Sequence, residues 1–210
     1  MKKVVISLFV LFIGLMANAA LRPDKVSDIP QGMIGVYQLN NDIEVYSKPD
    51  KKSEMIFQKK WDYSTVSSQD WTDNFFAIMN EKKECSYLYA RDLDEDFVEI
   101  LYNKQKGLYG WVYKSDSFQF LPWITFYNLY GRKYGLKFLK EAPQSVYVLY
   151  SRPNKDSQLL ARLNRPKEIR LTNIQGNWAL VTVLDIESVK TGYVQWRGEN
   201  GELYLFPLGL

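Results

Sequence analysis

Few side chains in this sequence have a type and spacing that could do chemistry, and the densest group is one short acidic run. Residues 92–96 read DLDED. Carboxylates at alternate positions are ligands of a calcium loop, but the glycine and the distant glutamate of such a loop are missing here. We interpret the run as a charged, solvated turn, with a metal site as the alternative. A carboxylate pair that cleaves glycosidic bonds is a further alternative, which no motif supports.

Histidine is absent from all 210 residues, and Cys85 is the only cysteine. The chain therefore cannot use Ser-His-Asp or Cys-His catalysis, and it cannot build a zinc site on imidazole. A single cysteine also excludes intrachain disulfides and CxxC redox chemistry, and we interpret Cys85 as a small buried apolar residue. The sequence predicts no catalytic residues, no metal and no cofactor, so we expect a protein that is not an enzyme.

Aromatic residues make up 15% of the chain, and a first group of them lies among three aspartates in residues 61–73. Its candidates for ligand binding are Trp61, Tyr63 and Trp71. Aromatic rings stack on the apolar faces of sugars or peptides while carboxylates accept hydrogen bonds. The alternative is an elaborated hairpin whose rings cover the core.

A second aromatic group follows Pro122 and contributes four further candidates, Trp123, Tyr127, Tyr130 and Tyr134. Residues 123–130 are nearly all apolar, whereas flexible linkers are polar or rich in Gly and Ser. Pro122 could begin a helical turn here and Gly131 could end one. We favour a wedge that joins two domains, with a ligand cleft between them. The alternative is an exposed stripe of ligand-binding rings.

Residues 1–19 have the pattern of a secretory signal peptide. Two lysines precede a mostly apolar run at 4–16, and Ala-Asn-Ala follows at 17–19. The run is shorter than the about 20 apolar residues that cross a membrane. We expect cleavage near Ala19 and a mature chain that is periplasmic or secreted, not an integral membrane protein. The alternative is a buried N-terminal helix.

The remaining charge does not indicate a nucleic-acid partner. Loss of Lys2 and Lys3 lowers the formal net charge from +3 to +1, and no basic stripe remains. The densest basic run follows the aromatic linker and contains Arg132, Lys133, Lys137 and Lys140. It could face an anionic wall polymer or a membrane surface, but we favour a solvated face.

An internal repeat organises the rest of the chain. Residues 46–54 read YSKPDKKSE and residues 150–158 read YSRPNKDSQ, with five of nine positions identical. Three further matches follow in the same order: 97–102 with 178–183, 110–113 with 192–195, and 118–122 with 203–207. The first copy is 23 residues longer between its first two matches, which places an insertion within residues 59–96.

Each copy has the pattern of short strands. Residues 178–184 alternate as a strand with one solvent face does, and residues 146–150 are β-branched and aromatic. Glu-Asn-Gly at 199–201 predicts a hairpin turn. Five or six short strands in about 65 residues favour a small closed barrel.

The second copy resembles the bacterial SH3-like domain family. Ser-Arg-Pro at 151–153 opens a polar loop that ends in Ser157, an aromatic residue, Trp178, begins the central strand, and Gly-Tyr-Val follows at 192–194. Gly176 fits the glycine that precedes this aromatic in the family, and the first copy lacks such a glycine before Phe97. The resemblance implies a binding or targeting module outside the cytoplasm, often beside cell-wall peptidases and without catalytic residues of its own.

We therefore expect a mainly β protein in which a packed aromatic linker joins two tandem SH3-like small barrels. The expected segments are a signal peptide at 1–19, an N-terminal segment at 20–42, a first domain at 43–122, a linker at 123–143 and a second domain at 144–210. The expected function is non-catalytic recognition of cell-wall peptide or glycan. The alternatives are a protein–protein module that inhibits or scaffolds a periplasmic enzyme, and a glycan-cleaving enzyme.

Overall fold

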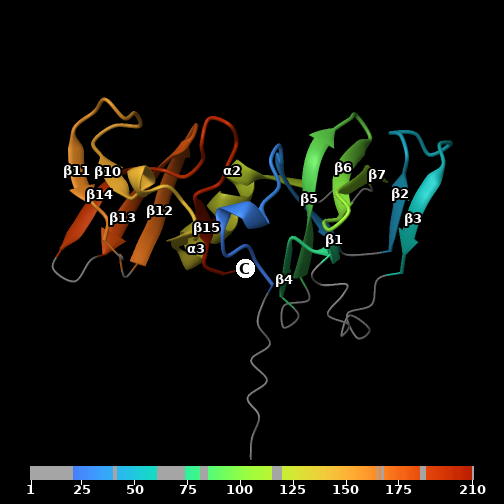
Figure 1. The fold of residues 1–210 in the computed structure, drawn as a ribbon, viewed down its shortest axis with the longest axis horizontal. Coiled ribbons are helices and arrows are strands. Elements are labelled where there is room, and N and C mark those ends of the chain that lie inside the picture. Colours follow the sequence, from blue (N-terminus) through green and yellow to red (C-terminus); the bar gives the residue numbers. More distant parts are fainter. Residues whose placement is uncertain are drawn as a thin grey trace, which may run out of the picture.

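The fold is mainly β, with two sheets and a few short helical segments (Figure 1). The computed structural model describes residues 21–39, 42–60, 74–80, 85–114, 120–164, 166, 168–184 and 188–209. The predicted signal peptide lies outside these ranges. None of the helices within them has the length and apolarity that a membrane crossing needs.

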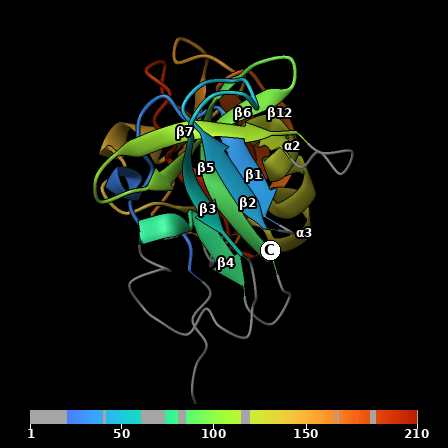
Figure 2. The same ribbon diagram turned by 90° about the vertical axis from the view of Figure 1, so that its right-hand side faces the viewer.

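The first sheet forms one end of the molecule, the first lobe, whose strands face the viewer in Figure 2. Its strands are β1 (Gly35–Leu39), β2 (Ile43–Tyr46), β3 (Met55–Lys59), β4 (Ile78–Asn80), β5 (Cys85–Leu93), β6 (Phe97–Asn103), β7 (Leu108–Tyr113) and β8 (Phe120–Pro122). Within the described residues their order is β3-β2-β7-β6-β5-β1-β8, and β4 pairs with β5 beside this path. All of these pairings are antiparallel.

The second sheet forms the opposite end, the second lobe (Figure 1). Its strands are β9 (Leu136–Phe138), β10 (Val148–Tyr150), β11 (Leu159–Arg162), β12 (Glu168–Gln175), β13 (Trp178–Leu184), β14 (Val189–Gln195) and β15 (Leu205–Pro207). Their order among the described residues is β11-β10-β14-β13-β12-β9-β15. Along β13, half-buried and fully buried residues alternate, as expected for a strand with one face on the core.

The two lobes share one strand order. Leaving β4 aside, the strands from β1 to β8 take the same places in the first sheet as β9 to β15 take in the second. The repeat seen in the sequence is therefore also a repeat of topology. Each sheet begins earlier than its expected domain, because β1 precedes residue 43 and β9 lies in the expected linker, before residue 144.

The sheets are open, in contrast to the closed barrels expected from the sequence. The last strand of each lobe, β8 or β15, pairs with the strand that opens the lobe, β1 or β9. At the other end, β3 and β11 have one neighbour each among the described residues, β2 and β10. Because no ladder joins the two end strands there, neither sheet closes within the described part of the chain.

The insertion predicted for the first copy lies between β3 and β5. Residues 60–84 connect these strands, whereas residues 163–167 connect β11 to β12. Residues 74–80 of this connection are described, and they include β4 and the rings of Phe75 and Phe76. Both rings are buried in the first lobe, so this part of the insertion covers the core.

A continuous helical segment follows β8. It consists of α2 (Trp123–Phe126), the π-helical η4 (Tyr127–Gly131) and α3 (Arg132–Tyr134). The helix begins directly after Pro122, as predicted, but it runs through Gly131 and ends at Gly135, where φ is +80°. Gly131 serves packing instead of termination, because a Cβ there would approach Leu136 Cδ2 at 2.9 Å.

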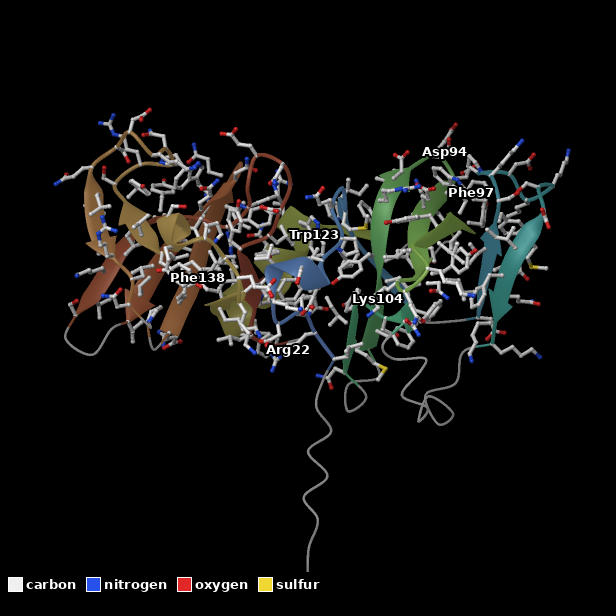
Figure 3. The ribbon with its side chains drawn as sticks, in the orientation of Figure 1. Arg22, Asp94, Phe97, Lys104, Trp123 and Phe138 are labelled. Carbon is white, nitrogen blue, oxygen red and sulfur yellow. The ribbon has the colours of Figure 1, made fainter. Side chains whose placement is uncertain are left out.

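The helical segment packs between the lobes and joins their cores (Figure 3 shows Trp123 at this position). Trp123 and Phe126 contact Tyr89 and Tyr87 of β5 on one side and Phe206 of β15 on the other. One cluster of buried residues therefore extends through both lobes. The packed linker expected from the sequence is present.

The N-terminal segment also crosses from one lobe to the other. Leu21 forms a bridge with Met79 of β4, and Lys25 forms one with Lys140 after β9. The short helix η1 (Val26–Asp28) follows, and a second one, η5 (Gln144–Val146), precedes β10. The Asp24 carboxylate forms ion pairs with the ammonium groups of Lys137, at 2.9 Å, and of Lys140, at 2.5 Å.

Candidate functional site

The aromatic candidates from the sequence lie in different surroundings. Outside the described residues lie Trp61, Tyr63 and Trp71. Trp123 is 2% exposed and Tyr127 is fully buried. The Trp123 indole N–H donates to the Met33 carbonyl oxygen at 2.8 Å, and the Tyr127 hydroxyl donates to the Leu205 carbonyl oxygen. Neither ring faces solvent in this structure, because both the apolar and the polar atoms are engaged between the lobes.

Tyr130 and Tyr134 lie further along the linker and are half-buried. The Tyr130 hydroxyl shares a hydrogen bond with the Tyr87 hydroxyl. Burial, followed by hydrogen bonds with Cys85 and Tyr130, raises the pKa of Tyr87 well above its ordinary value. The Lys133 ammonium lies 5.1 Å from the centre of the Tyr134 ring. Tyr130 and Tyr134 are therefore also packed against other side chains. Cys85, which we expected to be buried, is only partly buried.

A different set of side chains forms a line across the outer face of the second lobe. The cross-strand partners that define this second row are Leu159, Tyr150, Tyr193, Leu180 and Asn173, on β11, β10, β14, β13 and β12. Directly opposed residues of antiparallel strands point to the same side of a sheet. The other side is the core, where Leu149, Val181 and Val194 are buried. None of the five row residues is fully buried, so the row faces solvent.

The first lobe carries the same line in the same register. This first row consists of Met55, Tyr46, Trp111, Glu99 and Asp92, on β3, β2, β7, β6 and β5. These residues are likewise half-buried or exposed. At about 4.8 Å between strands, each row extends for about 19 Å. Two aromatic platforms with equivalent positions therefore occupy the two ends of one protein.

A loop that occurs in both repeats connects the two strands that carry the first two residues of each row. In the first lobe the Ser53 Oγ accepts a hydrogen bond from the Lys48 N–H at 3.3 Å and donates to the Lys48 carbonyl oxygen at 3.2 Å. In the second lobe Ser157 makes the same two contacts with Arg152, both at 3.2 Å. The motif that marked the repeat in the sequence is thus a hydrogen-bonded loop that fixes the turn between β2 and β3 or β10 and β11.

The same β-bulge follows each loop. The register shifts between Val45 and Tyr46 in the first lobe and between Leu149 and Tyr150 in the second. The extra residues are Ile56 and Leu160, and they pack over glycines of β7 and β14, one strand beyond β2 and β10. A Cβ at Gly110 would meet Ile56 Cδ1 at 3.0 Å, and one at Gly192 would meet Leu160 Cδ1 at 3.0 Å. Bulges recur near functional sites because they re-aim side chains.

The two rows differ in charge. In the first row Glu99 forms a bidentate ion pair with Arg91, at 2.7 and 2.6 Å, and this contact raises the pKa of Arg91. The Arg91 guanidinium also lies 3.7 Å from the centre of the Tyr109 ring, and the Lys51 ammonium lies 3.2 Å from the centre of the Tyr113 ring. Cations therefore cover the rings on both sides of the first row.

The turn predicted for the acidic run lies at residues 94–96, between β5 and β6, whereas Asp92 and Leu93 are the last residues of β5. Its Asp94 N–H donates to the Phe97 carbonyl oxygen at 3.0 Å, and both residues are labelled in Figure 3. The Lys114 ammonium donates to the carbonyl oxygens of Asp94 and Glu95, at 2.6 and 2.9 Å. Within the described residues, no group of three or more acidic or cysteine side chains could hold a metal ion.

Sequence reasoning did not single out the rows as candidate sites, although one signal for them was visible. Trp111 and Tyr193 occupy the same place in the repeated Gly-[Trp/Tyr]-Val motif, and the alternation of β13 places Leu180 on its solvent side. Which strands lie beside one another could not be read from these patterns. Half-buried rings with polar groups at their rim form a surface suited to ligand binding.

No protein-family model matches the sequence, and no curated protein is similar to it.

Proposed function

We propose that this protein is a non-catalytic, exported binding protein that recognises cell-wall peptide or glycan through tandem SH3-like domains. The observation that supports the proposal most is the repetition of a solvent-facing aromatic row, in one register, at both ends of the molecule. Tyrosine and tryptophan rings that are partly exposed at a surface contribute large contact area at low entropic cost. A stable fold alone does not require such rings on its solvent face.

The arrangement of the lobes supports a polymeric ligand. The buried helical segment joins the two sheets through one continuous core, so the rows are held at a fixed separation. Two sites that engage one repetitive polymer together bind it more tightly than either site alone, provided that the spacing fits. A cell wall offers such a repetitive polymer. The signal-peptide pattern of residues 1–19 supports an address outside the cytoplasm.

Co-sedimentation with purified, insoluble peptidoglycan tests the proposal. The mature protein is expected in the pellet at about physiological salt, where weak charge attraction is screened. The double variant Tyr46→Ala with Tyr150→Ala removes one ring from each row and is expected to leave more protein in the supernatant. Leu129→Ala is the matched control, because Leu129 is 51% exposed and apolar but lies on the linker. A wild-type protein that stays in the supernatant contradicts the proposal.

A protein–protein module is the second candidate function, and the sheet edges favour it. The end strands β3 and β11 begin with exposed apolar pairs: Met55 and Ile56 are 48% and 36% exposed, and Leu159 and Leu160 are 46% and 41% exposed. Edge strands can pair with an extended segment of a partner. This function predicts a stoichiometric partner in a pull-down from envelope extract and no affinity for purified wall.

A further inference from the structure

The second row differs from the first in carrying no charged side chain. Where the first row has Glu99 and Asp92, the second has Leu180 and Asn173. A ligand without charge can lie on the second row without stripping water from an ion. On the first row the same ligand would meet a carboxylate that is already paired with Arg91, and desolvation of paired charges is unfavourable.

Uncharged hydrogen-bonding groups border the second row. On one side Thr182 and Thr191 are cross-strand partners whose hydroxyl oxygens lie 3.1 Å apart. On the other side Gln175 is the partner of Trp178. A charged pair stands opposite Thr182, where Arg170 binds Glu168 in a bidentate ion pair. That pair is neutral as a whole, so the surroundings of the row offer hydroxyl and amide groups beside an aromatic centre.

This combination fits the chemistry of neutral sugar rings. The C–H face of a sugar lies on an aromatic ring, while its hydroxyl and acetamido groups exchange hydrogen bonds with neutral side chains at the rim. A charged stem peptide would find no opposite charge within the row. Resting on the proposed wall-binding function, we infer that the second row is the glycan site of this protein and takes neutral N-acetylated sugar rings.

The rings of the first lobe are less available to such a ligand. Lys51 covers Tyr113 and Arg91 covers Tyr109 on the two sides of the first row. A sugar that stacked on Tyr113 or on Tyr109 would have to displace the cation that covers that ring. The first row therefore serves as an internal comparison: it has the same strands and register, but a different charge.

Titration calorimetry with an N-acetylglucosamine hexamer and, separately, with a free wall stem peptide tests the inference. The wild-type mature chain is expected to bind the hexamer through the second row. Tyr193→Ala should weaken this binding about tenfold, which corresponds to about 1.4 kcal/mol. Trp111→Ala, at the same register position in the first row, should change it by less than about twofold.

A second pair of variants guards against a folding defect at Tyr193. Leu159 and Met55 are exposed equivalents at the ends of the two rows, so Leu159→Ser and Met55→Ser should both fold. Only Leu159→Ser should weaken hexamer binding. Tyr193→Phe should keep the hexamer affinity that Tyr193→Ala loses, because the ring remains. Binding should also persist at high salt, since no charge in the row is screened.

The outcomes separate this inference from the proposed function. Co-sedimentation of the wild type with wall but no binding of the hexamer would overturn the glycan site and leave the wall-binding proposal intact. Equal losses from Trp111→Ala and Tyr193→Ala would overturn the assignment to the second row. Binding of the stem peptide in place of the hexamer would overturn the sugar chemistry. If the wild type bound neither wall nor hexamer, both proposals would fall.

Discussion

The ring of Tyr150 stands edge-on to Trp178, with centroids 5.6 Å apart and planes at 89°. The equivalent rings of the first lobe, Tyr46 and Phe97, meet at 6.4 Å and 86°. Edge-on contact is a favourable geometry for two aromatic rings. In each lobe the row tyrosine on β2 or β10 is thus packed against the aromatic residue that begins β6 or β13.

Substitution of Trp178 should lower the free energy of unfolding by an amount that depends on whether an aromatic ring remains. Trp178→Ala removes a half-buried ring and its edge contact with Tyr150, and we expect a loss of about 2 kcal/mol. Trp178→Phe should lose less than about 1.5 kcal/mol, because the first lobe already uses phenylalanine at this position. Urea unfolding of both variants measures the difference. Equal losses would show that the ring contact contributes nothing.

The serine that closes each repeated loop should contribute to stability in both lobes. Ser53→Ala and Ser157→Ala each remove one hydroxyl that bonds the loop backbone, so each should lower the free energy of unfolding by about 1 kcal/mol. The double variant should lose the sum, because the two loops belong to different sheets.

Ser151→Ala is the matched control for the loop variants. Its side chain is exposed, and alanine keeps the backbone N–H that donates to the Gln158 carbonyl oxygen at 2.9 Å. The change should stay within about 0.5 kcal/mol. Urea midpoints for the four variants decide the matter, and a Ser151→Ala loss as large as that of Ser157→Ala would contradict the role of the closing hydroxyl.

Acid should release the N-terminal segment from the second lobe. Hydrogen bonds from Lys140 and then Lys137 lower the pKa of Asp24 from 3.8 to about 2. Because the pKa in the folded state is the lower one, the contribution to stability is complete above the unfolded value and is lost as the pH falls through about 2. Unfolding of wild type and Asp24→Asn from about pH 5 to about pH 2 should therefore give curves that converge at the acid end.

The carboxyl resonance of Asp24 gives a direct check. In wild type its midpoint should lie near 2, and in Lys140→Ala it should move toward 3.8, because the largest cause of the shift is removed. A midpoint that did not respond to Lys140→Ala would show that this contact does not set the pKa.

The sequence was sufficient to predict the repeat and most strands of the second lobe, because these depend on local patterns. The alternation at 178–184 became β13 with the predicted bounds, and the Pro122 start of the linker helix was found. Gly176, with φ at +57°, forms the two-residue turn before Trp178. The acidic turn before Phe97, where that glycine is missing, is longer.

The open sheets and the rows could not be predicted, since both depend on strand partners that are distant in the sequence. β9 has three residues, Leu136 to Phe138, too few to show an alternation, and it gains its place through Ile169 of β12 and Phe206 of β15. Tyr150 and Tyr193 each have an ordinary strand context, and only the pairing of β10 with β14 brings them together.

The buried linker should make the two lobes unfold together. Trp123→Ala removes a ring that is 2% exposed and contacts residues of both lobes, so we expect a loss of about 3–5 kcal/mol. Because the shared core is interrupted, the single wild-type transition should separate into two. Ile124→Ala, at the neighbouring position with a side chain 45% exposed, should stay within about 0.5 kcal/mol and keep one transition. Calorimetric scans distinguish these cases, and a Trp123→Ala protein that unfolded in one unshifted transition would show that the linker ring does not couple the lobes.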